Sequence, residues 1–239
     1  MALSNLERCE NMKILSIDTA SDLCTVAVLE NENCIKEIIV NDARNHSEKI
    51  MPVIEQALQE TNLTLKNIDL LVCDIGPGSF TGIRIGVATV LAFQDSLNVP
   101  CVGISSLEAL AYNTSENGLI CSLIDAKNNN VYVGIFKLEN NQYSQLGNLE
   151  FKTIEETIRI LKEFNSPITF VGDGTVAHKD LLKSNLENCL FSDKNELSSY
   201  SLGMAGFNKY KKGIQTSLMP LYLRKSQAER ALEEKTKKE

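Results

Sequence analysis

The chain has 239 residues, 43% of them hydrophobic, which is enough for one large domain or two small ones and excludes a globally disordered protein. Its formal net charge of −7 argues against a surface built mainly to contact nucleic acid, because such surfaces are basic. The seven cysteines include no C-x-x-C pair, which fits a reducing, cytoplasmic environment better than a disulfide scaffold.

The N-terminal part of the chain predicts a sheet led by antiparallel hairpins. Residues 1–11 lack the apolar core of a signal peptide and are interpreted as an N-terminal extension. Five apolar or alternating segments predict strands at 13–20, 24–31, 34–40, 68–76 and 99–105. Apolar residues with helical spacing predict helices at 46–61 and 81–98. No apolar stretch is long enough to span a bilayer, so we expect no membrane contact.

The C-terminal part repeats the same types of element. Its pattern predicts a strand, turn and strand over 119–140, a helix at 154–164, a strand at 168–174 and a helix at 201–213. The segment SIDTASDLCTVAVLEN around Asp18 resembles LIDAKNNNVYVGIFKLEN around Asp125, 107 residues later (125 − 18). This similarity predicts a duplicated α/β domain, with each half carrying a sheet flanked by helices.

The segment DIGPGSFTGIRIGVA at 74–88 is rich in glycine but matches neither a P-loop nor a dinucleotide-binding fingerprint. Two interpretations stay open. The loop could bind an anion at the start of the following helix. Alternatively, Gly78, Gly82 and Gly86 repeat every four residues on one helix face, which favours the close approach of another backbone. The helix is apolar all round, so its second face requires cover from this chain or from another one.

Polar residues of the chain give weak signals for chemistry. Asp18 and Asp125 follow strands and could hold a metal-bound nucleotide, but each could equally cap its own turn. The only histidines, His46 and His178, have no metal-ligand spacing, so we expect no metal site. A basic group near the C-terminus is interpreted as a solvated surface rather than a tRNA contact: Lys209, Lys211, Lys212, Arg224, Lys225 and Arg230.

Several segments together resemble the TsaB family, also called YeaZ. They are KILSIDTAS, RNHSEKIMPVIEQAL, DIGPGSFTGIRIGVATVLAF, VPCVGISSLEALA and PLYLRK, and the resemblance runs from Met12 to about Ser226. It implies an α/β fold of two actin-like (ASKHA, RNase H-like) domains with duplicated mixed β-sheets flanked by helices. The implied division is an N-terminal domain of 12–105 plus about 201–226, a C-terminal domain of 106–200 and a charged tail of 227–239.

The resemblance also implies a function. The family belongs to the bacterial machinery that forms N6-threonylcarbamoyladenosine at position 37 of tRNAs that read ANN codons. The implied partners are a TsaD-type catalytic paralogue, a TsaE-type ATPase, a second copy of the chain when it is alone, and tRNA only indirectly. The paralogue has two metal-binding histidines in an N-H-x-E-G-H segment, where this chain has SSLEAL with Ser106 and Leu110. We therefore expect a non-catalytic subunit without a metal.

The resemblance and the patterns together name two sets of candidate residues. A partner interface is expected at His46, Ile50, Met51, Ile54, Gly78, Gly82, Ile85, Gly86 and Thr89. Candidate nucleotide-binding residues are Asp18, Thr19, Asp125, Gly172, Asp173 and Gly174. We expect no cofactor of the chain's own, with ATP or ADP at a complex interface. An ATP-dependent phosphotransferase and a glycoprotease-like peptidase are the alternative functions.

Overall fold

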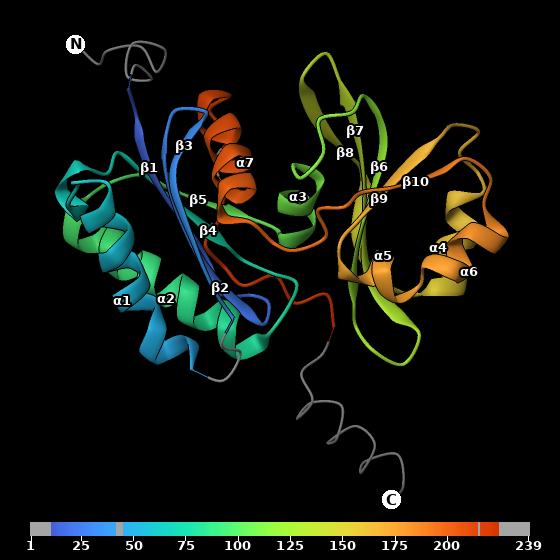
Figure 1. Ribbon diagram of the computed structural model, residues 1–239, viewed down its shortest axis with the longest axis horizontal. Coiled ribbons are helices and arrows are strands. Elements are labelled where there is room, and N and C mark those ends of the chain that lie inside the picture. Colours follow the sequence, from blue (N-terminus) through green and yellow to red (C-terminus); the bar gives the residue numbers. More distant parts are fainter. Residues whose placement is uncertain (1–10, 42–44, 215, 225–239) are drawn as a thin grey trace, which may run out of the picture.

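The computed structural model describes residues 11–41, 45–214 and 216–224, which form two five-stranded sheets with helices in layers beside them (Figure 1). The first half contains β1 (Lys13–Asp18), β2 (Leu23–Glu30), β3 (Asn33–Asn41), α1 (His46–Glu60), the short 3₁₀ helix η2 (Leu65–Asn67), β4 (Leu70–Asp74), α2 (Phe80–Leu97), β5 (Cys101–Ile104) and α3 (Ser106–Ala111). The second half contains β6 (Gly118–Asp125), β7 (Asn130–Glu139), β8 (Gln142–Thr153), α4 (Ile154–Leu161), β9 (Ile168–Val171), α5 (Asp173–Ala177), α6 (Lys179–Asn185), β10 (Cys189–Phe191) and α7 (Ser199–Lys211).

The two sheets have the same topology. Their strand orders are β3-β2-β1-β4-β5 and β8-β7-β6-β9-β10. In each sheet the three strands that come first in the chain form antiparallel pairs. The fourth strand pairs parallel with the first one, and the fifth pairs parallel with the fourth. Asp18 ends β1 and Asp125 ends β6, at equivalent positions. The duplication predicted from these two segments is therefore confirmed, as is the class of two mixed sheets flanked by helices.

The helices form three layers around the two sheets. In Figure 1, α1 and α2 cover the outer face of the first sheet, and α4 and α6 lie on the outer side of the second. Between the sheets lie α3 and α7. Although α7 follows β10 in the chain, it returns to pack on β1, β2, β4 and β5. None of the helices in the described ranges combines the length and the apolar character needed to cross a bilayer.

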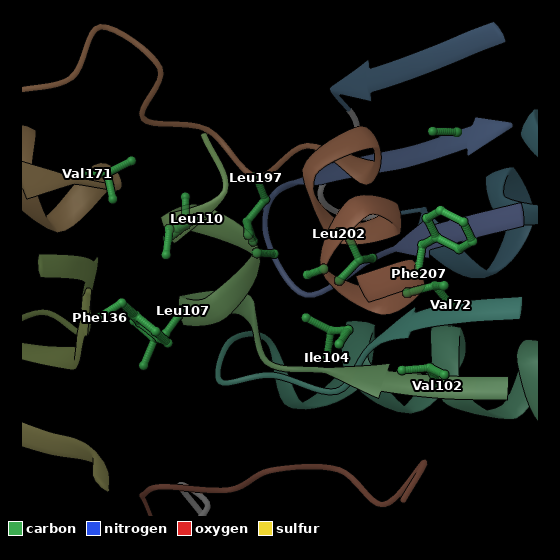
Figure 2. Close-up of a cluster of buried hydrophobic side chains, with 14 of the residues drawn as sticks. Val72, Val102, Ile104, Leu107, Leu110, Phe136, Val171, Leu197, Leu202 and Phe207 are labelled. Carbon is green, nitrogen blue, oxygen red and sulfur yellow. The ribbon is translucent and has the colours of Figure 1, made fainter. Parts of the chain in front are cut away.

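One apolar core joins the two halves (Figure 2). Val72 and Ile104 come from the first sheet, Leu107 and Leu110 from α3, and Phe136 from the second sheet. Burial of each such side chain contributes about 1.5–3 kcal/mol. Because this core is continuous from one sheet to the other, the expected division at residues 105/106 and 200/201 stays a prediction.

Six elements were not predicted from the sequence, one of them the short 3₁₀ helix η2. Three are the short helices α3, α5 and α6, which hold too few turns to show a helical repeat. The other two are β8 and β10, edge strands whose side chains are mostly exposed or half-buried. Pairing with β7 and β9 defines these strands, and a hydrophobic pattern does not report such pairing.

After α7 the chain runs over the first half to reach the second. The backbone N–H of Gly103 donates to Thr216 Oγ1 at 2.7 Å, and the N–H of Leu221 donates to the carbonyl oxygen of Ile75 at 2.7 Å. Further along, Arg224 donates to the carbonyl oxygen of Ala126 at 3.1 Å. We call residues 216–224 the C-terminal strap, since it bonds to both halves.

Candidate functional site

A cleft of about 560 Å³ lies between the two halves. One wall is the turn after β1, with the loop that precedes α2, and the opposite wall is the turn after β6 with the start of α5. The lining residues are Ala20, Ser21, Asp22, Leu23, Asn41, Pro77, Gly78, Ser79, Leu110, Ile124, Asp125, Ala126, Lys127, Tyr132, Asp173, Asn195, Glu196 and Leu197. Both segments of the sequence duplication therefore meet at this cleft.

The glycine-rich loop provides a close contact inside the chain. A Cβ at Gly78 would overlap the carbonyl oxygen of Ala20, and one at Gly82 would overlap that of Thr19. Thr19 Oγ1 also donates to the carbonyl oxygen of Gly82 at 2.7 Å, and the Ser79 N–H donates to that of Ala20 at 2.7 Å. The glycines let α2 lie directly on the turn after β1.

Gly82 and Gly86 therefore serve a contact inside the chain, whereas the place of the half-buried Gly78 in a partner interface stays a prediction. Gly82 and Gly86 are buried, and a Cβ at Gly86 would lie 2.6 Å from Thr19 Oγ1. The close backbone approach that the four-residue spacing predicted does occur, but the approaching backbone belongs to this chain. The interpretation of the loop as an anion site stays a prediction.

Three predicted interface residues of α1 also lie in the chain's own core. Ile50 and Ile54 are 2% and 1% exposed and belong to the cluster between α1, α2 and the first sheet. His46 is buried, with Nε2 3.0 Å from the carbonyl oxygen of Ser21. These side chains are not available to a partner, and this part of the interface prediction is wrong because the apolar stripe of α1 faces its own sheet.

The outer surface of α1 and α2 keeps a different set of apolar residues. Met51 is 49% exposed and Leu91, which the sequence did not single out for an interface, is 40% exposed. Ile85 and Thr89 are half-buried. We call this surface the α1–α2 outer face, with the members Met51, Ile85, Ala88, Thr89, Leu91 and Ala92. The described chain does not cover this face of α2, so of the two expected covers, this chain or another one, the cover by another chain stays a prediction.

Asp18 and Thr19 do not face the cleft. Asp18 is 1% exposed, and its Oδ1 accepts the backbone N–H of Ala20 at 2.7 Å. Asp74 lies at the end of the neighbouring strand and is equally buried. Its Oδ1 accepts the N–H of Gly76 at 2.6 Å and the hydroxyl of Ser106 at 2.7 Å. The sequence analysis missed Asp74 although, like Asp18, it is an aspartate that ends a buried strand.

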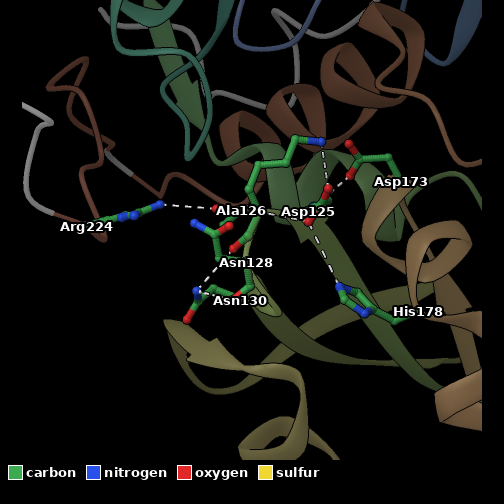
Figure 3. A network of polar contacts seen from close by, with 8 residues as sticks. Asp125, Ala126, Asn128, Asn130, Asp173, His178 and Arg224 are labelled. Carbon is green, nitrogen blue, oxygen red and sulfur yellow. Dashed lines mark hydrogen bonds and ion pairs between the residues drawn. The ribbon is translucent and has the colours of Figure 1, made fainter.

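Two of the predicted residues of the second half, Asp125 and Asp173, lie at the cleft wall (Figure 3). Asp125 lies between Asp173, whose Oδ1 accepts its backbone N–H at 3.0 Å, and His178, whose Nε2 is 4.0 Å from Asp125 Oδ1. Lys127 Nζ is 2.7 Å from Asp125 Oδ2. Partial burial acts to raise the pKa of Asp125, but hydrogen bonds from Lys127 hold it below the ordinary value.

Gly172 and Gly174 play the same part here as the glycines of α2 do in the first half. A Cβ at Gly172 would overlap the carbonyl oxygen of Leu123, and one at Gly174 would lie 2.9 Å from the carbonyl carbon of that residue. The start of α5 therefore packs directly on the end of β6. Neither glycine lines the cleft, whereas the neighbouring Asp173 does.

The charges of the cleft do not fit a nucleotide of the kind that actin-like ATPase folds bind. Asp22, Asp125, Asp173 and Glu196 line it, while Lys127 is the one basic side chain among the lining residues that the structure describes. The Lys127 ammonium is already paired with Asp125, and a polyphosphate would meet like charge from the remaining carboxylates. Asp18, the first half's counterpart of Asp125, is closed inside the core. We derive no nucleotide chemistry from this cleft.

The positions that correspond to metal ligands in the resemblance are filled by core side chains. Ser106 is fully buried and hydrogen-bonded to Asp74, and Leu110 is 1% exposed in the central core. Within residues 11–41, 45–214 and 216–224, no three His, Cys, Asp or Glu side chains are grouped so that they could hold a metal ion.

Most of the predicted basic group is engaged in contacts within the chain. Lys209 Nζ is 2.6 Å from Glu108 and Lys211 Nζ is 2.7 Å from Glu32. The Arg224 guanidinium lies over the ring of Phe151, 5.0 Å from its centre. Lys225 and Arg230 lie outside the described residues, as do the charged tail and residues 1–10 of the extension. Three of the four described members form intramolecular contacts, while Lys212 is exposed.

Sequence comparison relates the chain to tRNA-modification proteins. The family model for TsaD, tRNA N6-adenosine threonylcarbamoyltransferase, matches residues 34–232. The tRNA threonylcarbamoyladenosine biosynthesis protein TsaB of Bacillus subtilis is 31% identical over 222 residues, which cover 91% of this chain and 96% of that protein.

Solved structures share the fold. Two from Pseudomonas aeruginosa, one described as YeaZ and one as an uncharacterized protein similar to peptidase YeaZ, superpose with TM-scores of 0.75 and 0.76 at 24% identity, covering 89% of this chain and 100% of theirs. A ROK hexokinase from Thermus thermophilus reaches a TM-score of 0.50 at 10% identity, covering 84% of this chain and 100% of the hexokinase. The fold is thus the actin-like one, and the extent of the sequence match shows that the chain belongs to the TsaB family.

Proposed function

We propose that this chain is a non-catalytic subunit of the machinery that forms N6-threonylcarbamoyladenosine in tRNA. It docks onto a TsaD-type catalytic paralogue through the α1–α2 outer face, and the same face pairs two copies when the chain is alone. The B. subtilis relative is named for this biosynthesis, which supports the pathway. The exposed apolar surface on α1 and α2 is the observation that carries the docking role.

The chemistry of the α1–α2 outer face suits another helix. Ala88 and Ala92 are one turn apart and exposed, so a partner helix could approach α2 closely. Thr89 Oγ1 donates to the carbonyl oxygen of Ile85 at 2.8 Å, which leaves no unpaired hydroxyl on the surface. Met51 adds a flexible apolar side chain from α1, a type that adapts to irregular contact surfaces.

The absence of a catalytic role is supported by what occupies the expected chemical positions. Ser106 and Leu110 serve the core, and Lys127 neutralises the carboxylate that a metal-bound nucleotide would use. Any ATP or ADP of the complex, and the TsaE-type ATPase, are therefore assigned to the complex interface rather than to this cleft. The tRNA is contacted mainly by the paralogue, in line with the net charge of −7.

Size-exclusion chromatography with light scattering tests the docking role, on the chain alone and mixed with the TsaD-type paralogue of the same genome. We expect a homodimer that gives way to a heterodimer, and Leu91→Glu to weaken both by at least about tenfold, because a buried unpaired charge costs more than about 1.4 kcal/mol. The matched control is Val176→Glu, a 61% exposed residue of α5 in the second half. Assembly of Leu91→Glu with wild-type affinity would overturn the proposed face.

The non-catalytic role has its own test. The purified chain is incubated with tRNA and threonylcarbamoyl-AMP, with and without the paralogue, and modified adenosine is measured by mass spectrometry. We expect no product from the chain alone and product when the paralogue is present. Turnover by the chain alone would show that it is an enzyme.

A further inference from the structure

Two aspartates of the first half lie side by side in the core. β1 and β4 are parallel neighbours whose pairing includes Ile17 opposite Cys73, so Asp18 and Asp74 follow directly at the ends of the two strands. They are 1% and 2% exposed. Placing two carboxyl groups together away from water is unfavourable when both are ionised, because like charges repel strongly in a medium of low dielectric constant.

The hydrogen bonds of the pair leave one oxygen of each group without a donor. Oδ1 of Asp18 and Oδ1 of Asp74 accept backbone N–H groups, from Ala20 and Gly76. Oδ2 of each side chain is buried, and no N–H or O–H of the described residues donates to it. The parallel register of β1 and β4 places the two buried carboxyl groups side by side. Since ionised carboxylates only accept, a bond between them needs a proton.

Among the described groups that face this pair, the His46 imidazole acts to lower the pKa of Asp18, but burial and repulsion from Asp74 outweigh it. Cys24 of β2 and Cys73 of β4 are thiols, and burial raises the pKa of Cys24 to about 11 and that of Cys73 well above its ordinary value. His46 of α1 faces Asp18, with its Nε2 directed at the carbonyl oxygen of Ser21. From α3, Ser106 contributes a neutral hydroxyl. No lysine or arginine of the described chain forms an ion pair with either aspartate.

We propose that Asp18 and Asp74 share one proton at neutral pH, and that this proton locks the turn after β1 to the glycine loop and to α3. Asp18 is the proton donor, because Asp74 already accepts two hydrogen bonds and is the better place for the remaining negative charge. The lock lies where the cleft wall, the start of α2 and the helix that bridges the halves meet.

The expected pH dependence follows from the same arrangement. Burial and then repulsion from Asp74 raise the pKa of Asp18 well above its ordinary value, and burial raises the pKa of Asp74 to about 6. The folded protein therefore binds these protons more tightly than the unfolded chain does. The stabilisation is complete below the ordinary pKa of an aspartate and is lost as the pH rises from there through the folded-state values, of which that of Asp74 is about 6. Loss of the shared proton would loosen the two loops.

Infrared spectroscopy and a matched pair of variants test the lock in the full chain. Wild type is expected to show the carbonyl band of a protonated carboxyl at pH 7, and Asp18→Asn to lack it. The amide that this substitution introduces can still donate to Asp74, so the variant should melt within a few degrees of wild type at pH 6 and lose the fall in Tm between pH 6 and pH 9. Asp74→Asn moves the negative charge to Asp18, which accepts one hydrogen bond where Asp74 accepts two. This variant should therefore have a lower Tm than Asp18→Asn.

Hydrogen exchange supplies a readout that does not depend on global stability. The amides of Ala20 and Gly76 should exchange faster in wild type as the pH rises, after correction for the intrinsic rate, and Asp18→Asn should remove that acceleration. The proposal is overturned if no carboxyl band depends on Asp18, or if Asp18→Asn keeps the wild-type pH dependence. Failure of Asp74→Asn to fold leaves the infrared band and Asp18→Asn to decide.

Discussion

The two halves of this molecule use the same topology to place aspartates in opposite environments. In the first half, Asp18 and Asp74 end neighbouring strands, turn into the core and bond to the loops that follow them. In the second half, Asp125 and Asp173 occupy the corresponding edge of the sheet but line the cleft, where Lys127 pairs with Asp125. The two halves share a strand framework but differ in the polar groups at its edge.

This difference shows that strand topology alone does not fix the chemistry of a sheet edge. In both halves a helix start packs on the turn of the first strand through glycines, Gly82 against Thr19 and Gly174 against Leu123. Gly82 lies closer to Thr19 than Gly174 does to Leu123. The half with this closer contact holds the buried carboxyl pair, whereas the second half keeps its carboxylates in contact with water. Among the described residues, Lys127 is the cation at the second edge and is paired with Asp125, while no lysine or arginine forms an ion pair with Asp18 or Asp74 at the first.

The largest effect on the free energy of unfolding is expected from adding a side chain at Gly82, where α2 contacts the turn after β1. In Gly82→Ala the new Cβ would overlap the carbonyl oxygen of Thr19, and that backbone is held by the hydrogen bond from Thr19 Oγ1 to Gly82. We expect a loss of at least about 3 kcal/mol in the free energy of unfolding, measured by urea denaturation. Gly174→Ala should cost less, about 1–3 kcal/mol, because its nearest contact is 2.9 Å.

A neighbouring exposed position provides the control for this comparison. Thr81→Ala, one residue before Gly82 on the solvent side, should change the free energy of unfolding by no more than about 0.5 kcal/mol. Alanine also favours a helix over glycine by about 1 kcal/mol, so a loss in Gly82→Ala has to arise from the overlap. Equal stability of Gly82→Ala and wild type would mean that the turn after β1 moves away freely.

These contacts also show which features a sequence pattern can and cannot predict. Strands such as β1 and β2 were predicted because their buried residues form apolar runs, and the duplication was visible from the repeat around Asp18 and Asp125. The spacing of Gly82 and Gly86 predicted a close backbone contact, but spacing does not identify the backbone. In α1, Ile54 and Met51 are both apolar, and only packing decides that Ile54 faces the sheet while Met51 faces solvent.

A smaller effect on the free energy of unfolding is expected from removing the contacts that the C-terminal strap makes with the second half. Arg224→Ala removes a charged hydrogen bond to Ala126 and the contact with the Phe151 ring. We expect a loss of about 1–2 kcal/mol in the free energy of unfolding. Lys212→Ala, an exposed position on the first half, is the control and should have no measurable effect. If both variants are as stable as wild type, the strap does not hold the halves together.

The smallest effect on stability, but the clearest test of the opposite environments, is expected from Lys127→Asn. Lys127 has a φ of 64°, a conformation that asparagine tolerates, and its side chain is 81% exposed. The free energy of unfolding should change by less than about 1 kcal/mol, while the pKa of Asp125 rises toward its ordinary value in a carboxyl NMR titration. Lys137→Asn, which removes a similar exposed pair on β7, should leave Asp125 unchanged.

The sign of the pH dependence then separates the halves. The lowered pKa of Asp125 gives a stabilisation that is present above its unfolded value and is lost as the pH falls through the folded one. The raised pKa values of Asp18 and Asp74 act in the other direction and weaken the fold as the pH rises. Lys127→Asn should therefore reduce the gain in stability that accompanies a rise in pH through the acid range, and Asp18→Asn should reduce the loss of stability as the pH rises above the ordinary aspartate pKa. A variant that changed both trends would show that the two sheet edges are coupled across the cleft.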